Sequence, residues 1–299
     1  KALALPIMSA LPIFSPLDIK AASSAQAIAV GYTKNEDGSF EFNSLLASEI
    51  EKFFGLNLVD ELSFFTPAGK PGELFEIPVS ATDSVTERLY LVSIGDLSGA
   101  AMRAAGAAIG RKVRGKKTSV YSACAPKDAR AHAISMALGA WVWNLKTDKK
   151  KEEPTLLIGS KDKNQIEEAA TIARAICRAR DLIHTPANIK TPAWMGKQAE
   201  LFANGTGLKV KVFAGAELKE FGGLRAVGGS SPKPGPRMIQ VSYEPKSKKK
   251  SLKALPHIVL VGKGITFDTG GVSLKRPYDT MMAMKSDMAG SAAILATLT

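Results

Sequence analysis

Cysteine and histidine are scarce in this sequence, and their scarcity excludes several kinds of active site. Only Cys124 and Cys177 occur in 299 residues, and their separation fits no metal-binding or redox motif. Each is expected to be a buried, reduced thiol, which favours a reducing compartment such as the cytoplasm. No serine or cysteine lies in a nucleophile-elbow pattern, which argues against a nucleophilic triad. The three histidines are His132, His184 and His257, and the last, in an apolar run, is expected in the core.

The sequence also has no long apolar run. A membrane-spanning helix needs about 20 predominantly apolar residues, and the apolar opening segment, residues 2–14, is interrupted by Pro6 and Pro12. We therefore predict no membrane span. The first residue is Lys1 rather than methionine, which indicates a processed or incomplete chain. If a targeting peptide has been removed, an organelle matrix replaces the cytoplasm as the expected location.

Positive charge is in excess and is concentrated in three clusters. The formal net charge is +12 at pH 7, and no aromatic residues are interleaved with the clustered lysines in the manner of a nucleic-acid-binding surface. We interpret the clusters as solvated loops. The alternative is attraction to a nucleic acid or to another polyanion in a larger complex. The clusters lie at residues 111–117, 146–151 and 246–253.

Short apolar runs alternate with helical patterns through the first half of the chain. This alternation predicts an α/β fold built on a largely parallel sheet. A charged break before residue 155 divides the chain into an N-terminal α/β domain, residues 1–154, and a C-terminal α/β domain with a mixed, largely parallel central sheet, residues 155–299. In the N-terminal domain the expected strands are 27–31, 88–95 and 118–123, and the expected helices are 43–54, 97–109 and 129–143.

The second domain continues the alternation and contains the most apolar segment. The run LPHIVLV, residues 255–261, predicts a central parallel strand covered on both faces. Ligands in open α/β sheets bind at the carboxyl ends of such strands, so the following loop is expected to carry the site. The other expected elements are helices at 164–183 and 288–298, strands at 155–158, 208–213 and 237–243, and a glycine-rich link at 222–235. Asp181 is expected to be a surface charge near a helix end.

A lysine and two aspartates lie among glycines after this predicted strand. Lys263 and Asp268 are close enough in an irregular loop to converge, and Asp287 begins the next helix. A carboxylate can bridge two divalent ions in a site for amide hydrolysis, and a deprotonated lysine amine can also ligate a metal. Spacing alone leaves an ordinary turn with a salt bridge as the alternative. Phosphate-binding patterns fail, because Gly264 stands where a P-loop has Ser or Thr, and Phe267 stands where G-x-G-x-x-G has its third glycine.

The order of residues in this region resembles the leucine (cytosol) aminopeptidase family. VGKGITFDTGG at 261–271, SLK at 273–275 and M-x-x-MK-x-DM-x-G-x-A at 281–292 follow the family's pattern over an unbroken stretch. RDLIHTPAN at 180–188 and GGLRAVGGS at 222–230 are similar to other segments of its catalytic domain. The resemblance is strong over residues 155–299, and residues 1–154 match only in the rhythm of their elements.

The resemblance implies a role for five side chains. Lys263, Asp268 and Asp287 correspond to metal ligands, with Asp268 bridging two divalent ions, usually zinc, with manganese or magnesium as alternatives. Lys275 corresponds to the catalytic lysine that holds the developing oxyanion. Met284 corresponds to the lining of the pocket for the first side chain of a peptide substrate. The family releases N-terminal leucine and other apolar amino acids from peptides and assembles as homo-hexamers.

Two departures from the family pattern limit what this chain is expected to do. Between Lys275 and Asp287 there is one additional residue, within 276–280, which predicts a bulge beside Lys275. The family's N-T-D-A-E-G-R motif, which supplies two further metal ligands and a catalytic arginine, does not occur in the 299 residues. We therefore expect a chain truncated within the catalytic domain and inactive alone. The alternative is an inactive family member that serves as a structural or nucleic-acid-associated subunit.

Overall fold

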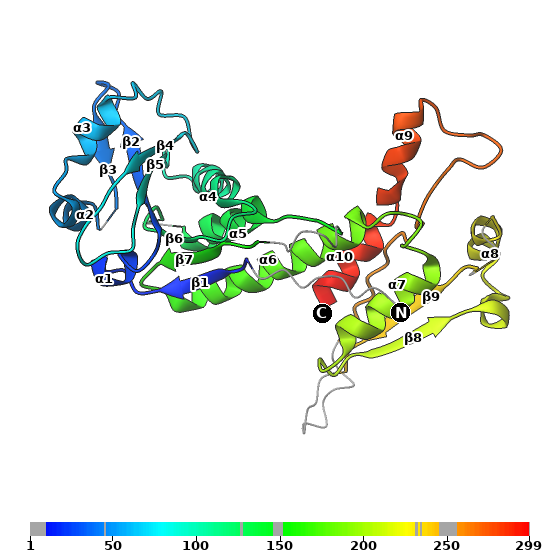
Figure 1. The fold of residues 1–299 in the computed structure, drawn as a ribbon. Coiled ribbons are helices and arrows are strands. Elements are labelled where there is room, and N and C mark those ends of the chain that lie inside the picture. Colours follow the sequence, from blue (N-terminus) through cyan, green and yellow to red (C-terminus); the bar gives the residue numbers. More distant parts are fainter. Residues whose placement is uncertain are drawn as a thin grey trace. The chain divides into compact units, whose positions relative to one another are not determined.

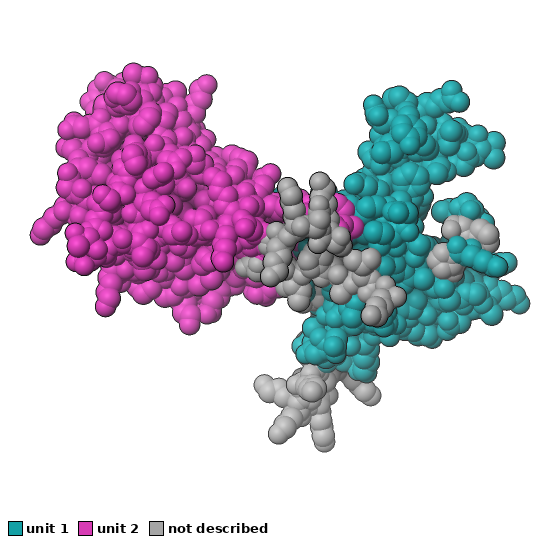
Figure 2. All heavy atoms as spheres, in the orientation of Figure 1, with its two compact units in different colours: residues 1–7, 178–299 teal, residues 8–177 magenta. Residues whose placement is uncertain are grey.

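The computed structural model describes residues 10–44, 46–125, 128–145, 152–230, 233, 235–244 and 256–298. Contacts divide the chain into two compact units between Cys177 and Arg178 (Figure 2).

A mostly parallel sheet forms the centre of the N-terminal unit (Figure 1). Its strand order is β1-β7-β6-β2-β5-β4, and the short β3 pairs with β2 in an antiparallel hairpin. The pairs along β1, β7, β6, β2 and β5 are parallel, whereas β4 closes the edge antiparallel to β5. The strands are β1 (Pro12–Ser15), β2 (Ala27–Lys34), β3 (Phe40–Phe42), β4 (Leu74–Pro78), β5 (Arg88–Ser93), β6 (Ser119–Ser122) and β7 (Thr155–Gly159).

Helices cover both faces of this sheet. Successive side chains of a strand point to opposite faces, so Ala27 and Ala29 of β2 pack into one core, whereas Ile28 and Val30 pack into the other. The first core is closed by α4 (Gly99–Val113), α5 (Ala129–Ala140) and the N-terminal part of α6 (Lys163–His184). The second is closed by α1 (Ile19–Ala22), α2 (Ala47–Phe54) and α3 (Leu58–Ser63). Burial on both faces explains why the central strands are apolar throughout.

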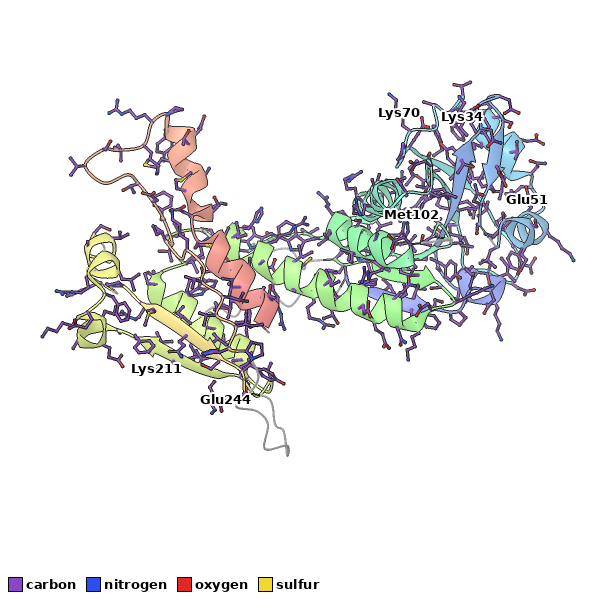
Figure 3. The ribbon with its side chains drawn as sticks, turned by 180° about the vertical axis from the view of Figure 1, so that it is seen from behind. Lys34, Glu51, Lys70, Met102, Lys211 and Glu244 are labelled. Carbon is purple, nitrogen blue, oxygen red and sulfur yellow. The ribbon has the colours of Figure 1, made fainter. Side chains whose placement is uncertain are left out.

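Small residues let α4 and α5 pack closely. A side chain at Gly106 of α4 would collide with the backbone carbonyl of His132 in α5, and one at Gly110 would collide with that of Met136. Met102, also on α4, is fully buried in the first core (Figure 3). The alanine- and glycine-rich composition of both helices is therefore a requirement of their close contact.

The C-terminal unit has a small core and an antiparallel strand pair. β8 pairs with β9 in a two-stranded sheet. Lys209, at the start of β8, forms an ion pair with Glu244, just after β9, at 2.9 Å. Figure 3 labels Glu244 and, on β8, Lys211. The core consists of Leu182, Trp194, Met195, Ala199, Met288, Ala292 and Leu295. The elements are α7 (Pro192–Ala203), β8 (Lys209–Phe213), η1 (Gly215–Leu218), α8 (Gly222–Gly228), β9 (Met238–Ser242), α9 (Tyr278–Ala283), η3 (Met284–Ser286) and α10 (Ala289–Leu298).

The predicted α/β fold with a mostly parallel sheet is confirmed, and that sheet lies in the N-terminal unit. The largely parallel sheet predicted for the C-terminal domain is not present among its described strands, which form one antiparallel pair. The predicted central strand at 255–261 is wrong over its described part. Residues 256–261 form no strand, and no described strand pairs with them. Ile258 is 76% exposed and Val261 is 88% exposed. A strand exists through hydrogen bonds to a neighbour, so an apolar run without one stays irregular and open to solvent. For the same reason His257 is exposed and not in the core.

The units divide at a different place from the predicted boundary at 154/155. β7 lies between β1 and β6 in the N-terminal sheet, so residues 155–159 belong to that sheet, and the division falls within α6. Part of the predicted glycine-rich link forms α8. Asp181 is 5% exposed, which contradicts the expected surface position.

Both cysteines are buried and neither forms a disulfide, as predicted. Among the described helices, none is long and apolar enough to cross a membrane. The basic clusters at 146–151 and 246–253 lie outside the described residues. In the cluster at 111–117, which is described, Lys112 pairs with Glu76 at 2.6 Å, while Lys116 and Lys117 are exposed.

His132 is fully buried under the N-terminal sheet. Its Nδ1 lies 3.2 Å from the carbonyl oxygen of Met102, and its Nε2 lies 2.8 Å from the Ser122 hydroxyl. The Met102 carbonyl can only accept, so Nδ1 carries the proton and Nε2 accepts from Ser122. Burial lowers the pKa of His132 from 6.5 to about 4. The folded protein thus keeps this histidine neutral in mildly acidic solution.

We predict that His132 makes the N-terminal unit less stable as the pH falls from 6.5 towards 4. In that window the unfolded chain binds a proton that the folded chain does not, which favours unfolding by up to about 3 kcal/mol. Denaturant unfolding across this pH range measures the effect. The stability of His132→Gln should depend less steeply on pH. The control is His257→Gln, in which glutamine replaces an exposed histidine. Parallel curves for wild type and His132→Gln would contradict the prediction.

Candidate functional site

The loop that follows residues 256–261 lies directly against the start of α10. A side chain at Gly262 would come within 2.6 Å of the Gly290 carbonyl oxygen and 2.8 Å of the Ser291 Cα. The Ser291 amide donates to the Lys263 carbonyl at 2.9 Å. Two glycines therefore allow backbone to meet backbone here, and the contact fixes where the side chain of Lys263 begins.

Lys263 forms an ion pair with Asp287. Asp287 ends the η3 turn, where its amide donates to the Met284 carbonyl at 3.1 Å. The Lys263 Nζ lies 2.9 Å from the Asp287 Oδ1. The other carboxylate oxygen, Oδ2, is buried and has no hydrogen-bond partner. A buried carboxylate oxygen without a partner is costly, so this atom marks a place where a positive ligand would be stabilised.

Asp268 forms a second ion pair, with Lys275, across a tight turn. Gly270 has a φ of +85°, and a side chain there would come within 3.0 Å of the Lys275 amide nitrogen. The Lys275 amide donates to the Thr269 carbonyl at 2.9 Å, which closes the turn. The Asp268 Oδ1 then accepts from the Gly270 amide at 2.9 Å, and its Oδ2 lies 3.2 Å from the Lys275 Nζ. The left-handed conformation at Gly270 thus aims Lys275 at Asp268.

The hydrogen bond from the Gly270 amide and the bond from Lys275 hold the pKa of Asp268 below its usual value. The charge of Lys263 acts in the same direction, so both lysines of the site stabilise this carboxylate. Asp268 is therefore ionised over a wide pH range.

The structure brings together the four charged residues that the sequence singled out, as two lysine–aspartate pairs on one loop and the adjoining turn. Met284 is half-buried and begins η3, the turn that ends at Asp287. Residues 276–277 form a bend, and residues 278–280 open α9. The additional residue expected within 276–280 therefore lies in this bend or in the first turn of α9.

The donor atoms of the site fit divalent cations. Two carboxylates and a lysine amine supply hard oxygen and nitrogen ligands, and the partnerless Asp287 Oδ2 is ready to accept a cation. Lys263 would have to lose its proton to act as a ligand. Over the described part of the chain, no three His, Cys, Asp or Glu side chains form a metal-binding group.

Sequence reasoning missed Lys190, which is fully buried beside this site. Burial, with a smaller contribution from the charge of Lys285, lowers the pKa of Lys190 to about 8. Its position two residues after the family-like segment 180–188 could have indicated a role in the site. A single lysine before a helix is, however, normally expected at the surface.

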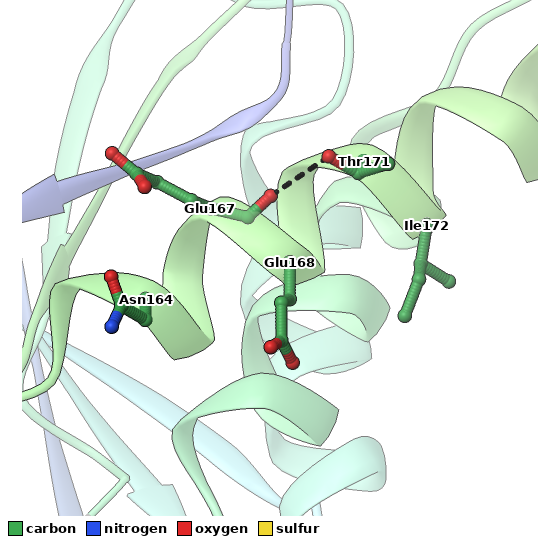
Figure 4. A pocket seen from close by; sticks show the side chains of 5 residues that line it. All are labelled: Asn164, Glu167, Glu168, Thr171 and Ile172. Carbon is green, nitrogen blue, oxygen red and sulfur yellow. Dashed lines mark hydrogen bonds between the residues drawn. The ribbon is translucent and has the colours of Figure 1, made fainter. Parts of the chain in front are cut away.

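Two surface hollows of the described residues lie elsewhere. One is shallow and runs along the exposed face of α6, where the Thr171 hydroxyl donates to the Glu167 carbonyl at 3.1 Å (Figure 4). Another lies beside Lys34, Gly69 and Ser98 in the N-terminal unit. Neither contains a residue of the Lys263–Asp287 region, so neither is the predicted site.

Comparisons with known proteins agree with this picture. Residues 177–299 match the family model described as the cytosol aminopeptidase family, catalytic domain. A probable cytosol aminopeptidase of Rhodococcus jostii is 34% identical over 259 residues, which cover 81% of this chain and 50% of that protein. One of Mycobacterium leprae is 41% identical over 148 residues, covering 48% and 28%. The chain thus spans about half the length, or less, of these curated relatives.

Solved structures show the same fold. The bottromycin maturation enzyme BotP in complex with Mn has a TM-score of 0.70 and 28% identity, and the match covers 92% of this chain and 55% of that one. A mutant of tomato leucine aminopeptidase has a TM-score of 0.74 and 21% identity, covering 96% and 58%.

These features define a class of α/β proteins. An α/β N-terminal unit is followed by a segment whose sequence matches a peptidase catalytic domain and which carries the paired lysines and aspartates. Within that class, the chain belongs to the leucine (cytosol) aminopeptidase family.

We predict that Gly262→Ala destabilises the C-terminal unit by about 1–3 kcal/mol, because the new methyl group meets backbone that has little room to move. Thermal or denaturant unfolding measures the change. Gly223→Ala is a matched control, because nothing lies within 4 Å of the new methyl group in α8 and alanine favours a helix. Equal stability of the two variants would show that the Gly262–Gly290 contact does not constrain the loop.

Proposed function

We propose that this protein is a metal-dependent aminopeptidase that releases N-terminal leucine and other apolar amino acids from peptides. The observation that carries the proposal is the pair of ion pairs Lys263–Asp287 and Lys275–Asp268, within the segment that matches the family's catalytic domain. Because the chain spans about half the length of its curated relatives, the activity is assigned to the protein made from the full coding sequence.

Lys263, Asp268 and Asp287 would hold two divalent ions, with zinc as the expected metal and manganese or magnesium as alternatives. When bound, such ions polarise a carbonyl group and activate water for attack on an amide. The chain's own residues supply the rest. Lys275 would hold the oxyanion as charge develops on the scissile carbonyl. Its bond to Asp268 keeps the ammonium oriented before substrate arrives.

Met284 would contact the side chain of the substrate's first residue. Its thioether is flexible and apolar, which suits leucine and similar side chains. Because Met284 begins the turn that ends at Asp287, the position of the substrate side chain and the position of a metal-ligating carboxylate are set by the same few residues.

We predict that Asp287→Asn lowers both metal affinity and leucine-amide hydrolysis. The amide removes the negative charge from the buried oxygen that lacks a partner. Loss of outer-shell partners of metal ligands costs about 10–100-fold, so loss of a ligand should cost at least that much. The test is steady-state hydrolysis and Zn²⁺ or Mn²⁺ titration of the protein made from the full coding sequence. Asp279→Asn, at an exposed position in α9, is the matched control.

Activity that survives exhaustive chelation, or an Asp287→Asn variant with wild-type metal affinity, would contradict the proposal. Absence of chelator-sensitive activity in a folded, metal-loaded protein would favour the alternative of an inactive structural subunit. A steep fall of nucleic-acid affinity with salt would then favour attachment to a nucleic acid.

We propose further that the protein works as a homo-hexamer in a reducing compartment such as the cytoplasm. Cys124 and Cys177 are buried and form no disulfide, which is consistent with that compartment. Exposed apolar residues in the C-terminal unit, including Val261 (88%), support association, because large exposed apolar areas mark interfaces. Sedimentation of the full-length product should give six times the subunit mass; a monomer over the micromolar range would contradict assembly.

A further inference from the structure

Lys190 lies between α6 and α7 with its side chain fully buried. A turn leads into it, in which the Ile189 and Lys190 amides both donate to the Pro186 carbonyl, at 3.0 and 2.9 Å. The side chain therefore starts from a fixed backbone position and points into the C-terminal unit.

The Lys190 ammonium bonds three backbone carbonyls. Its Nζ donates to Leu182 at 3.1 Å, to Ile183 at 3.0 Å and to Lys285 at 2.6 Å. An ammonium has three donors, so these bonds satisfy it completely. Leu182 and Ile183 belong to the last turn of α6, whose carbonyls have no partners within the helix and carry the negative end of its dipole. The charge is thus stabilised by oriented peptide groups.

The third carbonyl belongs to the site. Lys285 is the middle residue of η3, and the same turn is closed by the bond from the Asp287 amide to the Met284 carbonyl. Lys285 also reaches back, because its Nζ lies 3.4 Å from the carbonyl oxygen of His184, the last residue of α6. Two lysines therefore join the end of α6 to the η3 turn from opposite directions, one by a short, partly buried bond and one by a long, exposed bond.

We propose that Lys190 is a positioning residue that fixes the η3 turn and, through it, the carboxylate of Asp287. The consequence for metal affinity rests on the proposed function; the consequence for the turn does not. Without the bond to the Lys285 carbonyl, η3 loses its short, partly buried attachment to the end of α6 and keeps the longer bond from Lys285 to the His184 carbonyl. Asp287 would then sample more positions, and its partnerless oxygen would be less well placed to accept a cation.

The sign of the effect on metal binding separates positioning from simple electrostatics. Lys190 is a cation near a proposed cation site, so removal of its charge alone would strengthen the binding of a metal ion. Loss of positioning weakens binding instead. The change in metal affinity therefore has opposite signs in the two cases: affinity rises if Lys190 acts only by charge repulsion, and it falls if Lys190 orders the turn.

The test is Lys190→Met, which keeps the length and apolar body of the side chain and removes the donors. We expect Mn²⁺ affinity, measured by calorimetric titration of the protein made from its full coding sequence, to fall about tenfold, as for other outer-shell changes. We also expect amide hydrogen exchange of residues 284–287 to speed up, with exchange in the N-terminal sheet unchanged. Lys197→Met on α7, which removes an exposed lysine paired with Glu200, should change neither.

Tighter or equal Mn²⁺ binding together with unchanged exchange at 284–287 would overturn the proposal. If Lys190→Met does not fold, Lys190→Gln, which retains an amide donor in a shorter side chain, takes its place with a smaller expected change in the same direction. If the wild-type protein binds no Mn²⁺ and has no peptidase activity, the proposed function fails. Hydrogen exchange then decides the role of Lys190 by itself: faster exchange at 284–287 supports it, and unchanged exchange refutes it.

Discussion

The candidate site depends on one close approach, that of the Gly262 backbone to the Gly290 backbone. The bond from the Ser291 amide to the Lys263 carbonyl is possible only at this distance, and it places the loop on the first turn of α10. From there the loop can turn through Gly270 and return Lys275 to Asp268. Glycine at 262 and at 270 is therefore a geometric requirement, and the pairing of the charged residues depends on these two positions without side chains.

The N-terminal sheet was largely predictable from the sequence, because its central strands are short runs buried on both faces. β2 and β5 have that composition, α4 is rich in alanine, and α6 has apolar residues at helical spacing. β1, β3, β4 and α7 were not predicted, since the three strands are short and lie at or beside a sheet edge, and the apolar residues of α7 show no strict period. The run at 255–261 shows the converse limit. Composition gives a segment the ability to form a central strand, but pairing depends on residues distant in sequence.

The candidate site, too, was predictable from the sequence only in part. The order of residues identified Lys263, Asp268, Lys275 and Asp287, and the structure joins them in two pairs. Their proposed roles as ligands and catalyst are predictions still to be tested. The sequence could not show that one Asp287 oxygen is buried without a partner, because that depends on how η3 packs. Nor could it show that Lys190 reaches a carbonyl 95 residues away in the chain.

The open segment from His257 to Val261 has a consequence for how the protein is made. Four consecutive β-branched or aliphatic residues, without charge or proline, have the composition of segments that stack into cross-β assemblies. Lys263, two residues beyond, is the nearest following charge and acts as a gatekeeper against such stacking. The residue proposed to hold a metal is thus also the first charge after the exposed apolar run.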